Sequence, residues 1–124
     1  SRKIKGKLMH EGSIVKSLFD IANKIKEDEN LVEIHKIKVI VGKFHQIVDE
    51  VMFMYFDLMK KEYKGFENAE LIMEERDVKI KCKKCNQTLL IEEPIFICPN
   101  CESFDTEIVE GDELHIATIE GEKN

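Results

Sequence analysis

The sequence predicts an α/β protein of the α+β type, in which two helices lie on a small three-stranded sheet and a zinc-ribbon lobe is inserted between two strands. Three observations favour this fold: apolar residues at helical spacing near the start, runs of β-branched residues, and four cysteines confined to residues 82–101. A chain of 124 residues with 43% hydrophobic content suits one compact domain with a small appendage.

The four cysteines form two C-x-x-C pairs, and the twelve residues between the pairs allow a hairpin to bring them together. Such pairs favour a tetrahedral site of four thiolates for zinc. Asn86, directly after the first pair, tolerates the left-handed conformation that a metal knuckle often needs, and Pro99 stiffens the second turn. The expected zinc ligands are Cys82, Cys85, Cys98 and Cys101.

Two disulfides or a redox dithiol would explain less of this pattern. Disulfides would require a secreted chain, and a thioredoxin-like C-x-x-C would be single and follow a strand of a β-α-β unit. Because every cysteine is used in the pairs, we expect a reducing compartment, the cytoplasm. A closed site of four thiolates leaves no position for substrate, so the zinc is expected to support folding and not catalysis.

The first helix is predicted from Ser13, where Ile14, Leu18, Ile21 and Ile25 recur on one side, to a polar cluster at residues 27–30. Residues 32–41 form the first predicted strand because β-branched side chains alternate there with lysines, and Gly42 closes the run.

Asp49 is expected to cap the second helix, and Gly65 is expected just past its end. The apolar stripe of this helix is expected in the core and comprises Val51, Met52, Tyr55, Phe56 and Met59. Residues 69–82 read as a strand that leads into the ribbon, and residues 114–118 as the last strand.

This order divides the chain into three parts. Residues 1–8 carry four basic residues without periodicity and are expected to be a vector-derived leader or a disordered arm. Residues 9–77 and 111–124 form the α/β body, and residues 78–110 form the zinc-ribbon lobe.

The charge balance disfavours nucleic acid as a partner. The net charge is −6, and residues 78–110 contain four Lys against six Asp and Glu, so the lobe lacks the basic surface that binds phosphates. No apolar run is long enough for a membrane span, and we expect no membrane association. No nucleophile-and-base set or phosphate-binding glycine loop is present, which disfavours an enzyme.

The histidines differ in their surroundings. His35 and His115 fall within predicted strands, where a half-buried histidine is expected more often than a ligand. His45 lies in a loop, where a solvated ring is the usual outcome. His10 stands between Met9 and Glu11 ahead of the first helix, and a chain beginning at Met9 could bind Ni(II) or Cu(II) in a plane of the α-amine, backbone nitrogens and imidazole.

The Met9-His10-Glu11 start, the two C-x-x-C pairs and the segment Gly111-Asp112-Glu113-Leu114 together resemble the HypA/HybF family of nickel metallochaperones for [NiFe] hydrogenase maturation. The resemblance covers about 115 residues from Met9 onward. It implies a nickel-binding lobe and a structural-zinc lobe, a HypB-type GTPase and the hydrogenase large subunit as partners, and in some organisms service to urease.

By this resemblance His10 is the principal nickel ligand, Met9 supplies the amine and Glu11 assists, while the four cysteines hold zinc. Three positions depart from the family. An acid common in the family is shifted by one residue to Asp49, Lys43 replaces the usual Glu, and eight residues precede Met9, so its nitrogen is a peptide amide here.

Two other functions stay open from the residues. A zinc-ribbon module associated with nucleic acid or transcription would shift a DNA or RNA probe in a salt-dependent way. A purely structural adaptor would bind one zinc and no nickel.

Overall fold

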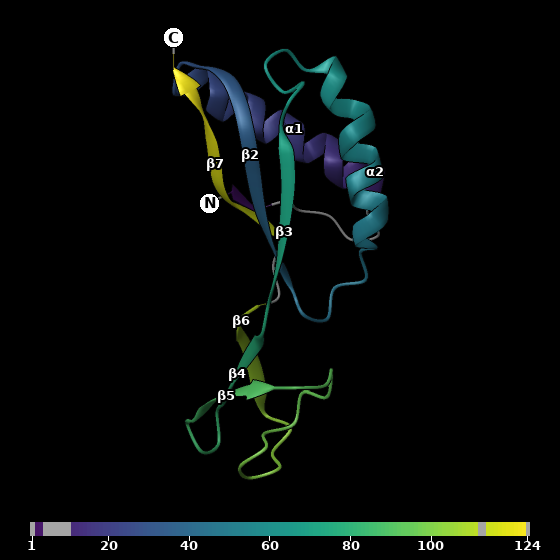
Figure 1. Ribbon diagram of the computed structural model, residues 1–124. Helices are drawn as coiled ribbons and strands as arrows, with labels where there is room; N and C mark the ends of the chain where they lie inside the picture. The colour runs from purple at the N-terminus through teal and green to yellow at the C-terminus, as the bar shows by residue number, and fades with distance from the viewer. Residues whose placement is uncertain (1, 4–10, 112–113, 124) are drawn as a thin grey trace.

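Two separate sheets organise the computed structural model of this chain, which describes residues 2–3, 11–111 and 114–123 (Figure 1). The larger sheet has the strand order β1-β7-β2-β3, and the smaller has the order β5-β4-β6. The elements of the larger sheet and its helices are β1 (Arg2–Lys3), α1 (Glu11–Asp28), β2 (Leu31–Gly42), α2 (Asp49–Met59), the 3-10 helix η1 (Lys60–Glu62), β3 (Glu70–Arg76) and β7 (His115–Lys123). The smaller sheet consists of β4 (Val78–Cys82), β5 (Thr88–Ile91) and β6 (Thr106–Glu110).

We call residues 9–77 and 111–124 the body and residues 78–110 the cysteine lobe, while β1 precedes the body and pairs with its strand β7. Figure 1 shows α1 crossing one face of the larger sheet and α2 at the side of β3. The cysteine lobe projects from the end of the long strands that is far from the C-terminus. The predicted α+β fold is confirmed. The three strands expected in the body are β7, β2 and β3, and the two-residue β1 adds a fourth beside β7 within the segment expected to be a leader or arm.

The body contains one β-α-β crossover. Strands β2 and β3 are parallel, with α2 between them in the chain, whereas β7 returns antiparallel on the other side of β2. Ile34, Ile37 and Val39 of β2 are fully buried against the helices. The polar residues between them are less buried, and the end of β2 from Val39 to Gly42 is buried throughout.

Aromatic stacking holds the body core together. Phe19 of α1 is fully buried, with ring-centroid separations of 4.9 Å to Phe56 and 4.6 Å to Tyr63 in stacked geometry. Phe66 meets the same ring edge-on at 5.6 Å. These contacts join α1, α2 and the segment after η1 around a single side chain, so Phe19 is the centre of the core.

The second helix differs from the prediction at both ends. It begins with Asp49 itself, and the cap residue is Val48, without a side-chain hydrogen bond, so the prediction of Asp49 as the cap is wrong by one residue. The helix ends at Met59 and continues as η1, while Gly65 (φ +90°) lies in a later turn. Tyr55 is 36% exposed, so its assignment to the core stripe is also wrong.

Two chain segments connect the body with the cysteine lobe, and they cross closely. One passes from β3 to β4 through Asp77, and the other leaves β6 at Gly111. A Cβ atom at Gly111 (φ +93°) would lie 2.2 Å from the carbonyl oxygen of Asp77, so only glycine fits this crossing. The lobes also touch through the Lys43–Glu92 ion pair at 2.9 Å.

The cysteine lobe has a small core of its own. Val78, Ile80 and Ile91 are buried together, and Phe44 from the body packs against them. Phe44 also meets Phe96 edge-on at 6.4 Å. A core of three aliphatic side chains is small for an ordered segment of this length, which makes the cysteines the principal remaining source of stability in this lobe.

Candidate metal centre

The four cysteine sulfurs lie together at the end of the cysteine lobe, as predicted. The Sγ atoms of Cys82 and Cys101 are 3.6 Å apart, and those of Cys85 and Cys98 are 3.7 Å apart. With Zn–S bonds of about 2.3 Å, a regular tetrahedron of sulfurs has edges of about 3.8 Å. All four thiols are unbridged. The separations therefore fit one zinc ion at the centre of the cluster.

Two matching backbone turns place these sulfurs. The N–H of Asn86 donates to the carbonyl of Cys82 at 2.8 Å, and the N–H of Glu102 donates to the carbonyl of Cys98 at the same distance. Asn86 (φ 61°) and Glu102 (φ 62°) are both left-handed. The prediction for Asn86 is confirmed, whereas Glu102 could have been found from its matching place, one residue after the second pair.

The thiol pKa values within the cluster are shifted in different directions. The N–H of Cys85 points at the Cys82 sulfur and lowers the pKa of that thiol to about 6, and the N–H of Gln87 lowers the pKa of Cys85. The N–H of Ser103 acts to lower the pKa of Cys101, but burial and the neighbouring thiols outweigh it and raise this pKa to about 12. Four thiolates this close require a cation, and a divalent ion with a preference for sulfur fits that requirement.

The proposed nickel ligands are placed only in part. Met9 and His10 lie outside the described residues. Glu11 is the first residue of α1, and its Oε2 accepts a hydrogen bond from the N–H of Val48 at 3.1 Å. The Glu11 carboxylate therefore links the start of α1 to the residue that caps α2.

His45 lies in the same connecting segment, but its geometry disfavours a ligand role. Its Nδ1 accepts the N–H of Ile47 at 3.0 Å. In the neutral ring the proton then lies on Nε2, so neither nitrogen offers a free lone pair to a metal in this conformation. Asp49 is exposed in the first turn of α2, where its charge is favourable to the helix dipole.

The structure also brings together a second group of possible ligands, which was not predicted from the sequence. The side chains of Glu33, His35 and Glu122 offer donor atoms that all lie within 4.8 Å of one another. The alternation Glu33-x-His35 puts two of them on one face of a strand, and this signal was available. The contribution of Glu122 depended on the pairing register of β2 and β7, which spacing alone does not give.

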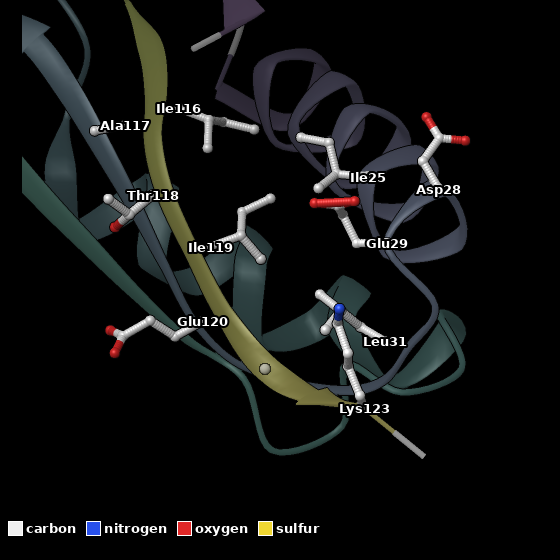
Figure 2. A pocket seen from close by; sticks show the side chains of 11 residues that line it. Ile25, Asp28, Glu29, Leu31, Ile116, Ala117, Thr118, Ile119, Glu120 and Lys123 are labelled. Atoms are coloured by element: carbon white, nitrogen blue, oxygen red, sulfur yellow. The ribbon is translucent and has the colours of Figure 1, made fainter.

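A groove of about 720 Å³ lies between the end of α1 and strand β7. Figure 2 shows Ile25 and Ile119 facing one another across it, with Asp28 and Glu29 along the helix side and Thr118 and Glu120 directed away. Its lining includes no histidine or cysteine. It is therefore separate from both groups of possible metal ligands.

Within the described part of the chain, no helix combines the length and apolar character needed to span a membrane.

Comparison with known proteins agrees with this geometry. Residues 9–121 match the family model described as hydrogenase/urease nickel incorporation, metallochaperone, hypA. The hydrogenase maturation factor HypA of Campylobacter jejuni is 32% identical over 111 residues, covering 90% of this chain and 97% of that relative. The factor of the same name from Aquifex aeolicus is 34% identical over 112 residues, with coverage of 90% and 96%.

A solved structure shares the fold. The solution structure of the Ni metallochaperone HypA from Helicobacter pylori has a TM-score of 0.74 at 21% identity, covering 94% of this chain and 100% of that one. A second solution structure of a HypA protein has a TM-score of 0.72 at 22% identity. With the match of the family model over nearly the whole sequence, the chain belongs to the HypA family of nickel-incorporation metallochaperones.

Proposed function

We propose that this chain carries Ni(II) and delivers it to the large subunit of a [NiFe] hydrogenase in the cytoplasm, with a HypB-type GTPase as partner and without catalysing a reaction itself. The observation that carries the proposal is the match of the nickel-incorporation family over residues 9–121, which starts at the Met9-His10-Glu11 segment. Nickel is the cargo, so its site must bind the ion and also release it.

His10 is the principal nickel ligand in this proposal. With Met9 as the first residue, the α-amine, the next backbone nitrogens and the imidazole of His10 complete a tetragonal plane that suits Ni(II). Glu11 assists by fixing the start of α1, since its carboxylate accepts a hydrogen bond from the N–H of Val48, the residue before α2. The body, residues 9–77 and 111–124, is thus the nickel-binding part.

The cysteine lobe, residues 78–110, holds structural zinc through its four thiolates. A tetrahedral set of sulfurs leaves no open coordination position, so the ion supplies folding energy and not chemistry. The contrast between a closed, soft cage for zinc and a nitrogen-rich site for nickel keeps the two ions apart by ligand type.

The test compares the chain of 124 residues with the same chain starting at Met9. Each form is loaded with zinc and titrated with Ni(II), and binding is followed by calorimetry and by absorption. We expect the form that starts at Met9 to bind about one Ni(II) with a square-planar d–d band, because its amine is a ligand. The longer form should bind nickel more weakly, because that amine becomes an amide.

His10→Ala should abolish the band in both forms, whereas the control His45→Ala should retain it. Zinc content should be the same in all variants, since the cysteines are unchanged. Equal nickel affinity in the two forms, or an intact band in the His10→Ala protein, would place the nickel site elsewhere.

A further inference from the structure

We propose a second site for a late first-row divalent metal ion on the open face of the body sheet, formed by His35 and Glu122 as ligands and oriented by Glu33. Ni(II), Zn(II), Co(II) and Cu(II) are among the ions that combine imidazole nitrogen with carboxylate oxygen in proteins. The site lies at the end of the body away from the cysteine lobe, where the start of β2 lies beside the end of β7 (Figure 1).

The strand geometry brings the three side chains together on one face. Glu33 and His35 lie on either side of Ile34, which is fully buried in the core, and Glu33 Oε1 lies 3.4 Å from His35 Nδ1, so the two side chains lie together outside the core. Glu122 of β7 is paired directly with Glu33 across the ladder. The three side chains therefore lie on the face opposite to the helices.

The distances match a metal ligand pair. His35 Nε2 and Glu122 Oε1 are 3.2 Å apart. At metal–ligand bonds of about 2.0–2.1 Å, two donors at this separation subtend about 100° at the ion, which lies between the octahedral and tetrahedral angles. A metal can thus bind both donors without a change of strand position, and water would complete its coordination.

Glu33 occupies the position of a carboxylate that orients a metal-binding histidine. Its Oε1 lies 3.4 Å from His35 Nδ1, on the other side of the ring from Glu122. A carboxylate on this side can accept the Nδ1–H of the ring when Nε2 binds a metal. The position of Glu33 therefore favours the tautomer that a metal at Nε2 requires.

The charge arrangement also favours a cation. Glu33 and Glu122 are direct cross-strand partners, and like charges in this relation destabilise a sheet. A protonated His35 could compensate one unit of negative charge, whereas a divalent ion compensates two. The side chains of His35 and Glu33 are 41% and 37% exposed, so an ion can enter from solvent.

The test uses zinc-loaded protein with His10→Ala, so that its outcome does not depend on the proposed nickel-delivery site. Ni(II) is added and amide signals are followed by NMR. One imidazole with carboxylate and water leaves Ni(II) paramagnetic, whereas a plane of backbone nitrogens makes it diamagnetic. We expect selective broadening of the amides of residues 33–35 and 121–123, with saturation near one equivalent, and no effect of Mg(II).

In the same background, His35→Gln should abolish the broadening, and Glu33→Gln should weaken binding about 10- to 100-fold, as for other residues that orient a ligand. Glu120→Gln is the matched control, because it removes an acid of the same strand outside the cluster, and it should bind normally. Thermal unfolding checks that each variant is folded. No broadening at these residues, or broadening that survives His35→Gln, would overturn the proposal and leave only a histidine between two acids.

Discussion

Phe19→Ala tests whether the body and the cysteine lobe are separate units of stability. Phe19 is fully buried and stacks on Phe56 and Tyr63. Truncation of a buried Phe costs about 3–5 kcal/mol, and stacked pairs contribute about 0.5–1.5 kcal/mol each beyond burial, so we expect the upper part of that range. With a urea m-value of about 2 kcal/mol/M, the midpoint of body unfolding should fall by about 2 M.

The stability of the cysteine lobe should not change in Phe19→Ala. Its core residues, Val78, Ile80 and Ile91, form a cluster separate from that of Phe19, and all four cysteines of the proposed zinc site lie in the lobe. Circular dichroism at 222 nm reports the body, because the helices α1 and α2 belong to it. A colorimetric zinc chelator reports the lobe. We expect the helical signal to shift while zinc release stays at the wild-type urea concentration.

Leu58→Ala is the control, because Leu58 is 62% exposed on α2 and its truncation should change stability by less than about 0.5 kcal/mol. If Phe19→Ala moves zinc release and helix loss by the same amount in one transition, the two lobes form a single cooperative unit and the reasoning from separate cores fails.

Three further outcomes follow from the contacts. Cys85→Ala should lose the zinc and the hydrogen-exchange protection of residues 78–110 while the body helices remain protected, and retention of one zinc per chain would contradict the assignment. Glu11→Ala should cost about 0.5–1.5 kcal/mol in urea unfolding and speed exchange of the Val48 amide, because that N–H loses its acceptor. The N–H groups of Glu67 itself and of Gly65 hold the pKa of the Glu67 carboxyl below its ordinary value of 4.5, so its stabilising effect is present above that pH and is lost as pH falls through the lowered pKa. Carbon-13 NMR titration should find that lowered midpoint, and Glu67→Gln should flatten the acid side of the stability curve.

Periodicity and spacing predicted the elements that depend on local patterns. The strand at residues 32–41 and the cysteine cluster were found because β-branched alternation and the C-x-x-C turns are local features. The predicted end of the second helix was wrong because a glycine in the left-handed conformation is common both directly after a helix and in a separate turn, and Gly65 lies in a separate turn. Only the structure distinguishes the two.

The acids and histidines were harder to place because their roles depend on long-range pairing. The Glu11 bond to Val48 joins residues from the starts of two different helices, and no spacing rule predicts it. His35 gained its neighbour Glu122 only through the antiparallel register of β2 with β7. One irregularity of that register falls at His35 itself, between Ile34 and Lys36, which makes such pairs difficult to derive from sequence.

The segment of residues 43–48 contacts both the start of α1 and the cysteine lobe, and the strength of these contacts limits how strongly the two parts influence each other through it. At one end the N–H of Val48 meets the Glu11 carboxylate at the start of α1, and at the other Phe44 packs on Phe96 of the cysteine lobe. The Lys43–Glu92 pair adds little, because the Glu92 side chain is 84% exposed. An aromatic contact contributes about 0.5–1.5 kcal/mol, so a coupling of about 1 kcal/mol between the lobes corresponds to about a fivefold change in an equilibrium constant. Loss of the proposed zinc site should then change the nickel affinity of the proposed site at the start of the body by about fivefold. A change in nickel affinity of several orders of magnitude would require contacts that residues 43–48 do not make.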